Sequence, residues 1–122
     1  MQTEFSADIP IFLQIAEQVE SAILCGALEE GAQAPSTTEI SVRYKINPAT
    51  ALKGVTRLVD DGVLFKKRGL GMFVADGARQ LILEKRRSAF FEKYVVPLLE
   101  EAVKLELSYE QLNEMLRRGI NK

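Results

Sequence analysis

The sequence predicts a mainly α-helical fold with one small β-hairpin, followed by a helical C-terminal segment. Three observations lead to this prediction. Apolar residues recur at three- and four-residue spacing over most of the chain. One pair of short strand-like runs flanks a glycine-containing turn near residue 69, and proline, serine and asparagine stand where helices would begin. The 122 residues suffice for one compact domain and a short extension.

The first helix is predicted over residues 10–23. Pro10 suits its first turn, because the N–H group that proline lacks would have no intrahelical partner there. Gly26 and Gly31 bracket the loop that ends the helix and turns the chain. The apolar stripe of this helix consists of Phe12, Ile15, Ala16, Val19, Ala22 and Ile23.

Cys25 is the only cysteine, which excludes an intrachain disulfide and favours a reducing compartment. It follows the apolar stripe directly, so we expect a small buried thiol rather than a redox sensor. The sequence has no signal pattern and no apolar run near the roughly 18 residues of a bilayer span. We therefore expect a cytoplasmic protein without membrane contact.

A short second helix is predicted from Thr37 to Tyr44. Ser36 and Glu39 have the spacing of a capping box, in which each side chain accepts from the other residue's backbone N–H. The helix is expected to bury Ile40 and Tyr44.

A third helix is predicted after a very short connection, Lys45-Ile46. Asn47 is a good N-cap, Pro48 a good first helical residue, and Gly62 ends the helix just beyond Asp60. Its apolar face is expected to consist of Ala51, Leu52, Val55, Leu58 and Val59.

A β-hairpin is predicted next, with strand-like runs at residues 63–67 and 72–74 on either side of Arg68-Gly69-Leu70-Gly71. The order is therefore helix, capped short helix, tight turn, proline-started helix and basic hairpin. This is the order of a winged helix-turn-helix, here spanning residues 9–75. We expect a DNA-binding domain at residues 1–76 and a helical dimerisation tail at residues 77–122.

The tail is predicted to begin with a long helix over residues 78–107. Pro97 must kink or divide it, because its ring clashes with the carbonyl of Lys93. Ser108 and Gln111 form a second capping box, and the helix that they start is expected to end near Gly119.

The broad apolar face of this tail predicts a homodimer, because so short a segment cannot cover the face alone. Packing against the chain's own winged domain is the alternative, and we expect it to account for part of the face. The residues predicted to form the dimer contact are Leu81, Phe90, Tyr94, Leu98, Leu99, Val103, Leu112 and Leu116.

Charge is distributed unevenly along the chain, although the formal net charge is only −1. Residues 40–75 contain seven Lys and Arg against two Asp, a local net charge of +5. Residues 1–39 contain no Lys or Arg and seven acidic residues. A basic face opposite an acidic one is typical of a nucleic-acid-binding module.

Double-stranded DNA is therefore the predicted partner. In a helix-turn-helix the second helix enters the major groove with its first residues against base edges. The helix caps and the hairpin also have purely structural interpretations, as caps and as a solvated edge strand that discourages sheet pairing. The predicted DNA contacts are Asn47, Pro48, Ala49, Thr50, Lys53 and Arg57 in and before the third helix, Ser36, Thr37, Thr38 and Lys45 in and around the second, and Lys66, Lys67, Arg68 and Gly69 in the hairpin.

An enzyme is not expected from this sequence, and neither a cofactor nor a metal is predicted. The chain has no histidine, no paired cysteines and no G-x-S-x-G motif, so the common nucleophile–base and zinc arrangements are missing. Gly69-Leu70-Gly71 is not a phosphate-binding motif, since no helix follows it directly.

Residues 10–75 resemble the N-terminal domain of the GntR family of regulators. The resemblance is carried by Pro10-Ile11-Phe12-Leu13-Gln14-Ile15-Ala16, by Gly31 through Pro35-Ser36-Thr37-Thr38-Glu39-Ile40, and by Asp61-Gly62-Val63-Leu64 with Arg68-Gly69-Leu70-Gly71-Met72-Phe73-Val74. The pair Asn47-Pro48 and the short helical tail are similar to the YtrA-like subfamily, whose tails mainly dimerise. Thr38, Pro48 and Leu52 stand where the family often has basic residues. Either Lys53 and the hairpin would therefore carry more of the DNA contacts, or the target sequence differs from the one usual in the family.

The resemblance implies a bacterial transcription regulator, expected to be a repressor, that binds an inverted-repeat operator as a homodimer. A small effector would modulate it by changing the angle between the two DNA-binding heads. The alternative is a winged-helix adaptor that binds a protein and no DNA. The negative net charge and the missing arginines favour the adaptor, whereas the basic window and hairpin favour DNA.

Overall fold

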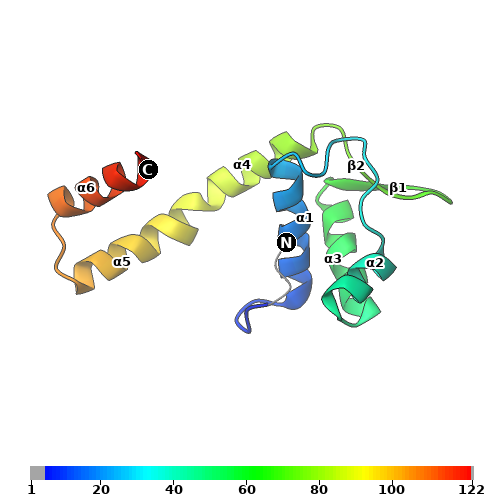
Figure 1. Cartoon of the computed structure of the whole chain (residues 1–122), viewed down its shortest axis with the longest axis horizontal. Coiled ribbons are helices and arrows are strands. Elements are labelled where there is room, and N and C mark those ends of the chain that lie inside the picture. The colour runs from blue at the N-terminus through cyan, green and yellow to red at the C-terminus, as the bar shows by residue number, and fades with distance from the viewer. Residues whose placement is uncertain (1–4, 122) are drawn as a thin grey trace. The chain divides into compact units, whose positions relative to one another are not determined.

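The computed structural model describes residues 5–121 and has the predicted order of elements (Figure 1). The chain divides into two compact units, Met1–Glu84 and Lys85–Lys122. The predicted division into a DNA-binding domain and a dimerisation tail at residues 76 and 77 is one of function and stays a prediction. The elements are α1 Ile11–Leu24, α2 Thr37–Tyr44, α3 Pro48–Asp60, β1 Leu64–Lys67, β2 Gly71–Val74, α4 Ala78–Phe90, a π-helical turn η1 Phe91–Val95, α5 Val96–Lys104 and α6 Tyr109–Ile120.

The core of the first unit forms where α1 packs along α3 (Figure 1). Ile15 on α1 and Leu58 on α3 are fully buried there, and Ile82 from the start of α4 joins them. Gly54 permits the close approach of the two helices, because a Cβ at this position would lie 3.0 Å from the backbone oxygen of Phe12. The packing therefore fixes α3 on the core by its inner face.

Helix α2 has the predicted bounds and the predicted capping box. Ile40 and Tyr44 are buried, as expected, and the Tyr44 hydroxyl donates to Oε1 of Gln18 at 2.8 Å. Lys45 ends the helix in the left-handed conformation with φ 54°. Ser41 closes the turn, because its Oγ donates to the carbonyl of Ile46 at 2.8 Å while its own carbonyl accepts from the Ile46 N–H. The short turn thus holds α2 and α3 in a helix-turn-helix.

The predicted hairpin is confirmed as an antiparallel pair, with Leu64 opposite Val74 and Lys67 opposite Gly71. Residues 31–34 pair with the other edge of β2 through a bridge between Gln33 and Phe73. Hydrogen bonds from Ala34 N to the Met72 carbonyl and from the Val74 N–H to the Ala32 carbonyl complete this edge. The hairpin is therefore the wing of a winged helix, and β2 is its central strand.

Two residues of the first unit differ from the sequence-based expectation. Leu52 was expected on the buried face of α3 but is 52% exposed, because that face is centred on Ala51, Val55 and Leu58 and Leu52 lies about 100° around the helix from Ala51. Cys25 was expected to be buried but is exposed. It is the C-cap residue, directly after the last helical residue of α1, so its side chain does not belong to the apolar stripe that faces the core.

The tail is divided at the predicted place. The π-helical turn stands directly before Pro97, and the Val96 N–H donates to the carbonyl of Phe91 across it. This wider turn accommodates the proline ring, which would clash in a regular helix. The second capping box, Ser108 with Gln111, is also confirmed, and α6 ends at Ile120, next to Gly119 as expected.

The second unit buries little of its own apolar surface. Among its described residues only Ala102 is buried. None of the helices in the described part of the chain is long and apolar enough to cross a membrane.

Candidate nucleic-acid interface

The first turn of α3 presents a capped, exposed helix end. Oδ1 of Asn47 accepts a hydrogen bond from the Ala49 N–H at 2.8 Å, and Pro48 is the first helical residue. Pro48 and Ala49 are exposed and Thr50 is half-buried. The cap uses only the oxygen of the Asn47 side chain, so its amino group can still donate to a base edge or a phosphate.

Lys53 lies one turn further along α3, and an aromatic ring supports its charged end. The Nζ atom is 4.8 Å from the ring centroid of Phe12 on α1. Both residues line a shallow groove of about 330 Å³ together with Leu52 and Arg57. A cation over a ring face keeps its full charge, so this contact holds Lys53 in place without neutralising it. Lys53 is thus available to an anion outside the protein.

The other basic residues on this side of the fold differ in their surroundings. Arg57 donates from Nε to Oδ2 of Asp61 at 3.2 Å, four residues along the chain. This ion pair offsets part of its charge. Lys45 is exposed at the end of α2. Of the two cations on α3, Lys53 is therefore the better placed to bind a phosphate or another anion outside the protein.

The first turn of α2 supplies backbone donors. Oγ of Ser36 accepts from the Glu39 N–H, and Oε1 of Glu39 accepts from the Ser36 N–H, each at 3.0 Å. The hydrogen bonds from Ser36 hold the pKa of the Glu39 carboxyl below its ordinary value. The capping box satisfies two N–H groups, and those of Thr37 and Thr38 have no acceptor within the helix. Thr37 is half-buried and Thr38 exposed, so both donors lie near the surface.

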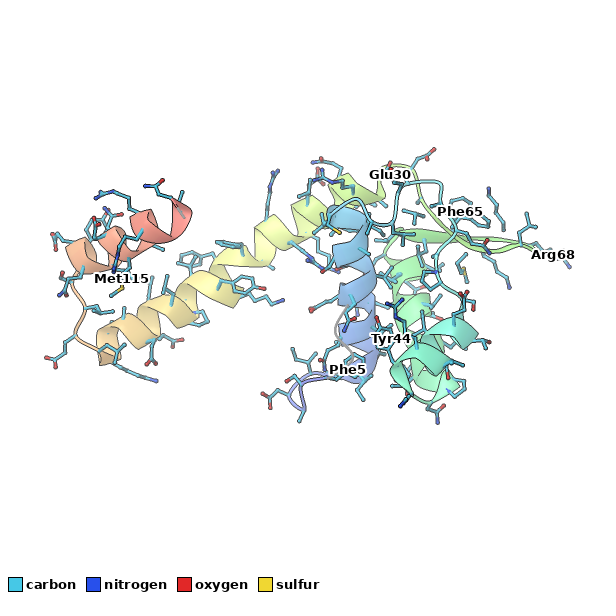
Figure 2. All side chains as sticks on the ribbon, in the orientation of Figure 1. Phe5, Glu30, Tyr44, Phe65, Arg68 and Met115 are labelled. Carbon is cyan, nitrogen blue, oxygen red and sulfur yellow. The ribbon has the colours of Figure 1, made fainter. Side chains whose placement is uncertain are left out.

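The three adjacent cations of the wing do not share one environment. The Nζ atom of Lys67 lies 4.3 Å from the ring centroid of Phe73 and 5.7 Å from that of Phe65. These two rings pair across the strands with their centroids 6.2 Å apart. Arg68 instead lies at the far end of the hairpin (Figure 2). The wing thus carries one cation on its aromatic pair and presents another at its tip.

Four residues that were not among the predicted DNA contacts position these elements. Phe12 supports Lys53, Ser41 closes the turn before α3, and Nε2 of Gln33 donates to the carbonyl of Leu70 in the wing at 2.8 Å. Glu30 accepts from the N–H groups of Gly77 and Arg79 at 2.8 and 3.1 Å and so caps the start of α4 (Figure 2). These hydrogen bonds lower the pKa of the Glu30 carboxyl. Most of these contacts join distant positions, which no local pattern reveals.

The residues predicted for dimerisation expose much of their apolar surface. Seven of the eight are between 40% and 77% exposed, and Leu112 is half-buried. Phe90 and Tyr94 also pack against one another, with ring centroids 5.4 Å apart. The described part of the chain contains no group of acidic, histidine or cysteine side chains that could hold a metal ion.

No family model matches the chain. Among curated proteins it is similar to the HTH-type transcriptional repressor YtrA of Bacillus subtilis. The identity is 25% over 117 residues, which cover 96% of this chain and 89% of that protein.

Two solved structures are also similar. A transcriptional regulator of the GntR family from Bacteroides thetaiotaomicron is 32% identical with a TM-score of 0.72, and the match covers 91% of this chain and 96% of that one. The DNA-binding domain of AraR in complex with operator ORX1 is 28% identical with a TM-score of 0.53. That match covers 62% of this chain and 92% of the AraR domain.

Proposed function

The chain belongs to the GntR family of transcriptional regulators, and on this premise we propose that it is a repressor that binds an inverted-repeat operator as a homodimer. The observation that carries the proposal is the outer face of α3. Its first turn is capped by Asn47 and exposed, and Lys53 follows one turn later with its charged end held by the ring of Phe12. Such a face suits the major groove of DNA.

In the proposed complex each element of the winged domain has its own contact. On α3, the Asn47 amino group and Thr50 would hydrogen-bond bases or phosphates, Ala49 would meet a thymine methyl, and Lys53 would meet a guanine or a phosphate. The free N–H groups and hydroxyls at the start of α2 would bind a phosphate. Arg68 at the wing tip would enter the minor groove or meet its phosphates. The operator complex of the AraR domain, a structure of this fold, supports DNA as the partner.

The homodimer is proposed from the exposed apolar residues of the tail, such as Phe90, Leu98 and Val103. A two-fold symmetric pair would place two α3 helices in successive major grooves, with half-site centres about 34–36 Å apart or a multiple of this distance. Repression would result from occupying a promoter, in line with the repressor function of YtrA. A small effector would alter binding by changing the angle between the two heads.

Fluorescence anisotropy tests the proposal, with labelled DNA from the region upstream of the chain's own gene, titrated at several salt concentrations. We expect binding that competitor DNA does not abolish, with a slope near −0.9 per phosphate contact over about 6–10 contacts. Lys53→Ala should weaken it, whereas Lys104→Ala removes an exposed lysine of the second unit and should leave it unchanged.

The adaptor alternative has one structural observation in its favour. Leu52 on α3 is 52% exposed and lines the shallow groove beside Lys53, which is apolar surface on the face proposed for DNA. If the chain binds specific DNA no better than unrelated DNA, and selection from random sequences also finds no site, a protein partner on this face becomes the better account.

A further inference from the structure

The side chain of Gln33 reaches the wing from a distant part of the sequence. Its Nε2 atom donates to the carbonyl of Leu70 at 2.8 Å, across 37 positions of the chain. The backbone of Gln33 is itself paired with Phe73 on β2, and this pairing fixes the position of the Gln33 Cα atom. The hydrogen bond therefore ties the end of the hairpin to the body of the first unit.

Gly71 shows how closely this side chain packs against the wing. A Cβ on residue 71 would lie 2.8 Å from Nε2 of Gln33, so a side chain there would displace the flexible end of Gln33 from its hydrogen bond. The φ of Gly71 is +118°, which side chains of L-residues rarely adopt. Gln33 and Gly71 are thus complementary, since the amide occupies the space that the missing side chain leaves.

Without this contact the wing tip would have few restraints. Gly69 also has a positive φ, and the turn is closed by a backbone hydrogen bond from the Leu70 N–H to the carbonyl of Lys67 at 2.9 Å. Two glycines in so short a turn give the backbone many alternative conformations. The Lys67 side chain lies over Phe73 and its backbone closes the turn, but both of these restraints lie within the hairpin itself. Gln33 adds a restraint on the far side of the turn from outside the hairpin.

We propose that Gln33 is a positioning residue for DNA recognition: it does not contact DNA, but holds the turn so that Arg68 points into the DNA groove. Its amide is a suitable tether because one hydrogen bond to a carbonyl adds no charge beside the phosphates. The inference rests on the proposed function, since it assumes that Arg68 contacts DNA.

A double-mutant cycle on the full chain tests this inference, with anisotropy on the preferred DNA sequence as the measurement. We expect Q33A to weaken binding by no more than R68A does, because Gln33 acts through Arg68. In the R68A background, Q33A should change the affinity less than about twofold, within the usual error of additivity. Q80A is the matched control: it removes an exposed glutamine whose amide bonds Glu84 on α4, and it should leave the affinity unchanged.

The contrary outcomes are distinct. Equal losses from Q33A in both backgrounds would mean that Gln33 contacts DNA itself or acts on overall stability, and would overturn the inference. A loss from R68A with none from Q33A, or no loss from R68A, would do the same. If the chain bound no specific DNA, the proposed function would fail instead, and amide relaxation of the free protein would decide the tether alone. Q33A should then increase fast motion at Gly69 and Leu70, and unchanged relaxation would refute the tether.

Discussion

Gly54→Ala probes the packing that places α3 on the core. The substitution adds one methyl group to a buried face of the helix. The new Cβ would lie 3.0 Å from the backbone oxygen of Phe12, 3.1 Å from Cγ2 of Ile15 and 3.2 Å from its Cβ. Ile15 is fully buried and the oxygen belongs to the backbone of α1, so neither can turn aside. Helices α1 and α3 must therefore separate by a few tenths of an ångström.

Two opposing effects set the magnitude. Alanine is favoured over glycine in a helix interior by about 1 kcal/mol. Overpacking a well-packed core typically costs about 1–3 kcal/mol, and contact with backbone places this site in the middle of that range. The net loss is therefore about 1 kcal/mol. For a chain of 122 residues this corresponds to a decrease of about 4 °C in the midpoint of thermal unfolding.

Thermal unfolding followed by circular dichroism at a fixed protein concentration measures the effect. Gly119→Ala is the matched control, because Gly119 also lies in a helix but has no atom within 4 Å of the added Cβ. It should leave the midpoint unchanged or raise it slightly. A Gly54→Ala protein that unfolds at a higher temperature than the parent would refute the close packing of α1 and α3.

Three further predictions concern the caps, the carboxylates and the tail. Ser36→Ala removes the acceptor of the α2 capping box and should lower the free energy of unfolding by about 1 kcal/mol, measured by urea denaturation; an unchanged value would contradict the cap. The pKa values of Glu30 and Glu39 lie below the ordinary value of 4.5 in the folded state, so their contribution to stability is present above pH 4.5 and lost as the pH falls through the folded values. The midpoint temperature of thermal unfolding should therefore decrease as the pH is lowered from 4.5, and it should decrease less steeply in Glu30→Gln. Parallel plots of midpoint temperature against pH for the two proteins would contradict the contribution of Glu30. Val103→Asp should convert a dimer into a monomer in light scattering at micromolar concentration, while Ser88→Asp should not, and a Val103→Asp dimer would exclude this residue from the interface.

The order and bounds of the elements were predictable because local signals set them. Helix α2 begins at the capping box of Ser36 with Glu39, and α3 begins at Asn47 with Pro48, as expected. Each of these signals lies within about four residues of the structure that it determines. The same holds for the division of the tail, where Pro97 alone forces an irregular turn.

The contacts that prepare the candidate interface were not predictable, because they join distant positions. The sequence identified Lys53 and Lys67 as cations but could not place Phe12 under one and Phe73 under the other. Leu52 was wrongly predicted to be buried for a related reason. The periodicity of apolar residues shows that α3 has an apolar stripe, but it does not show how much of that stripe the rest of the fold covers. Side-chain surroundings depend on tertiary packing, which a single sequence does not specify locally.

The most direct test of dimeric, sequence-specific DNA binding is selection from a random double-stranded DNA pool by the purified full chain. The account predicts enrichment of an inverted repeat whose half-site centres lie about one helical turn apart, or a multiple of it. It also predicts that Lys53→Ala selects the repeat more weakly. A pool without an enriched sequence, or with a single half-site only, would contradict the proposed dimeric repressor.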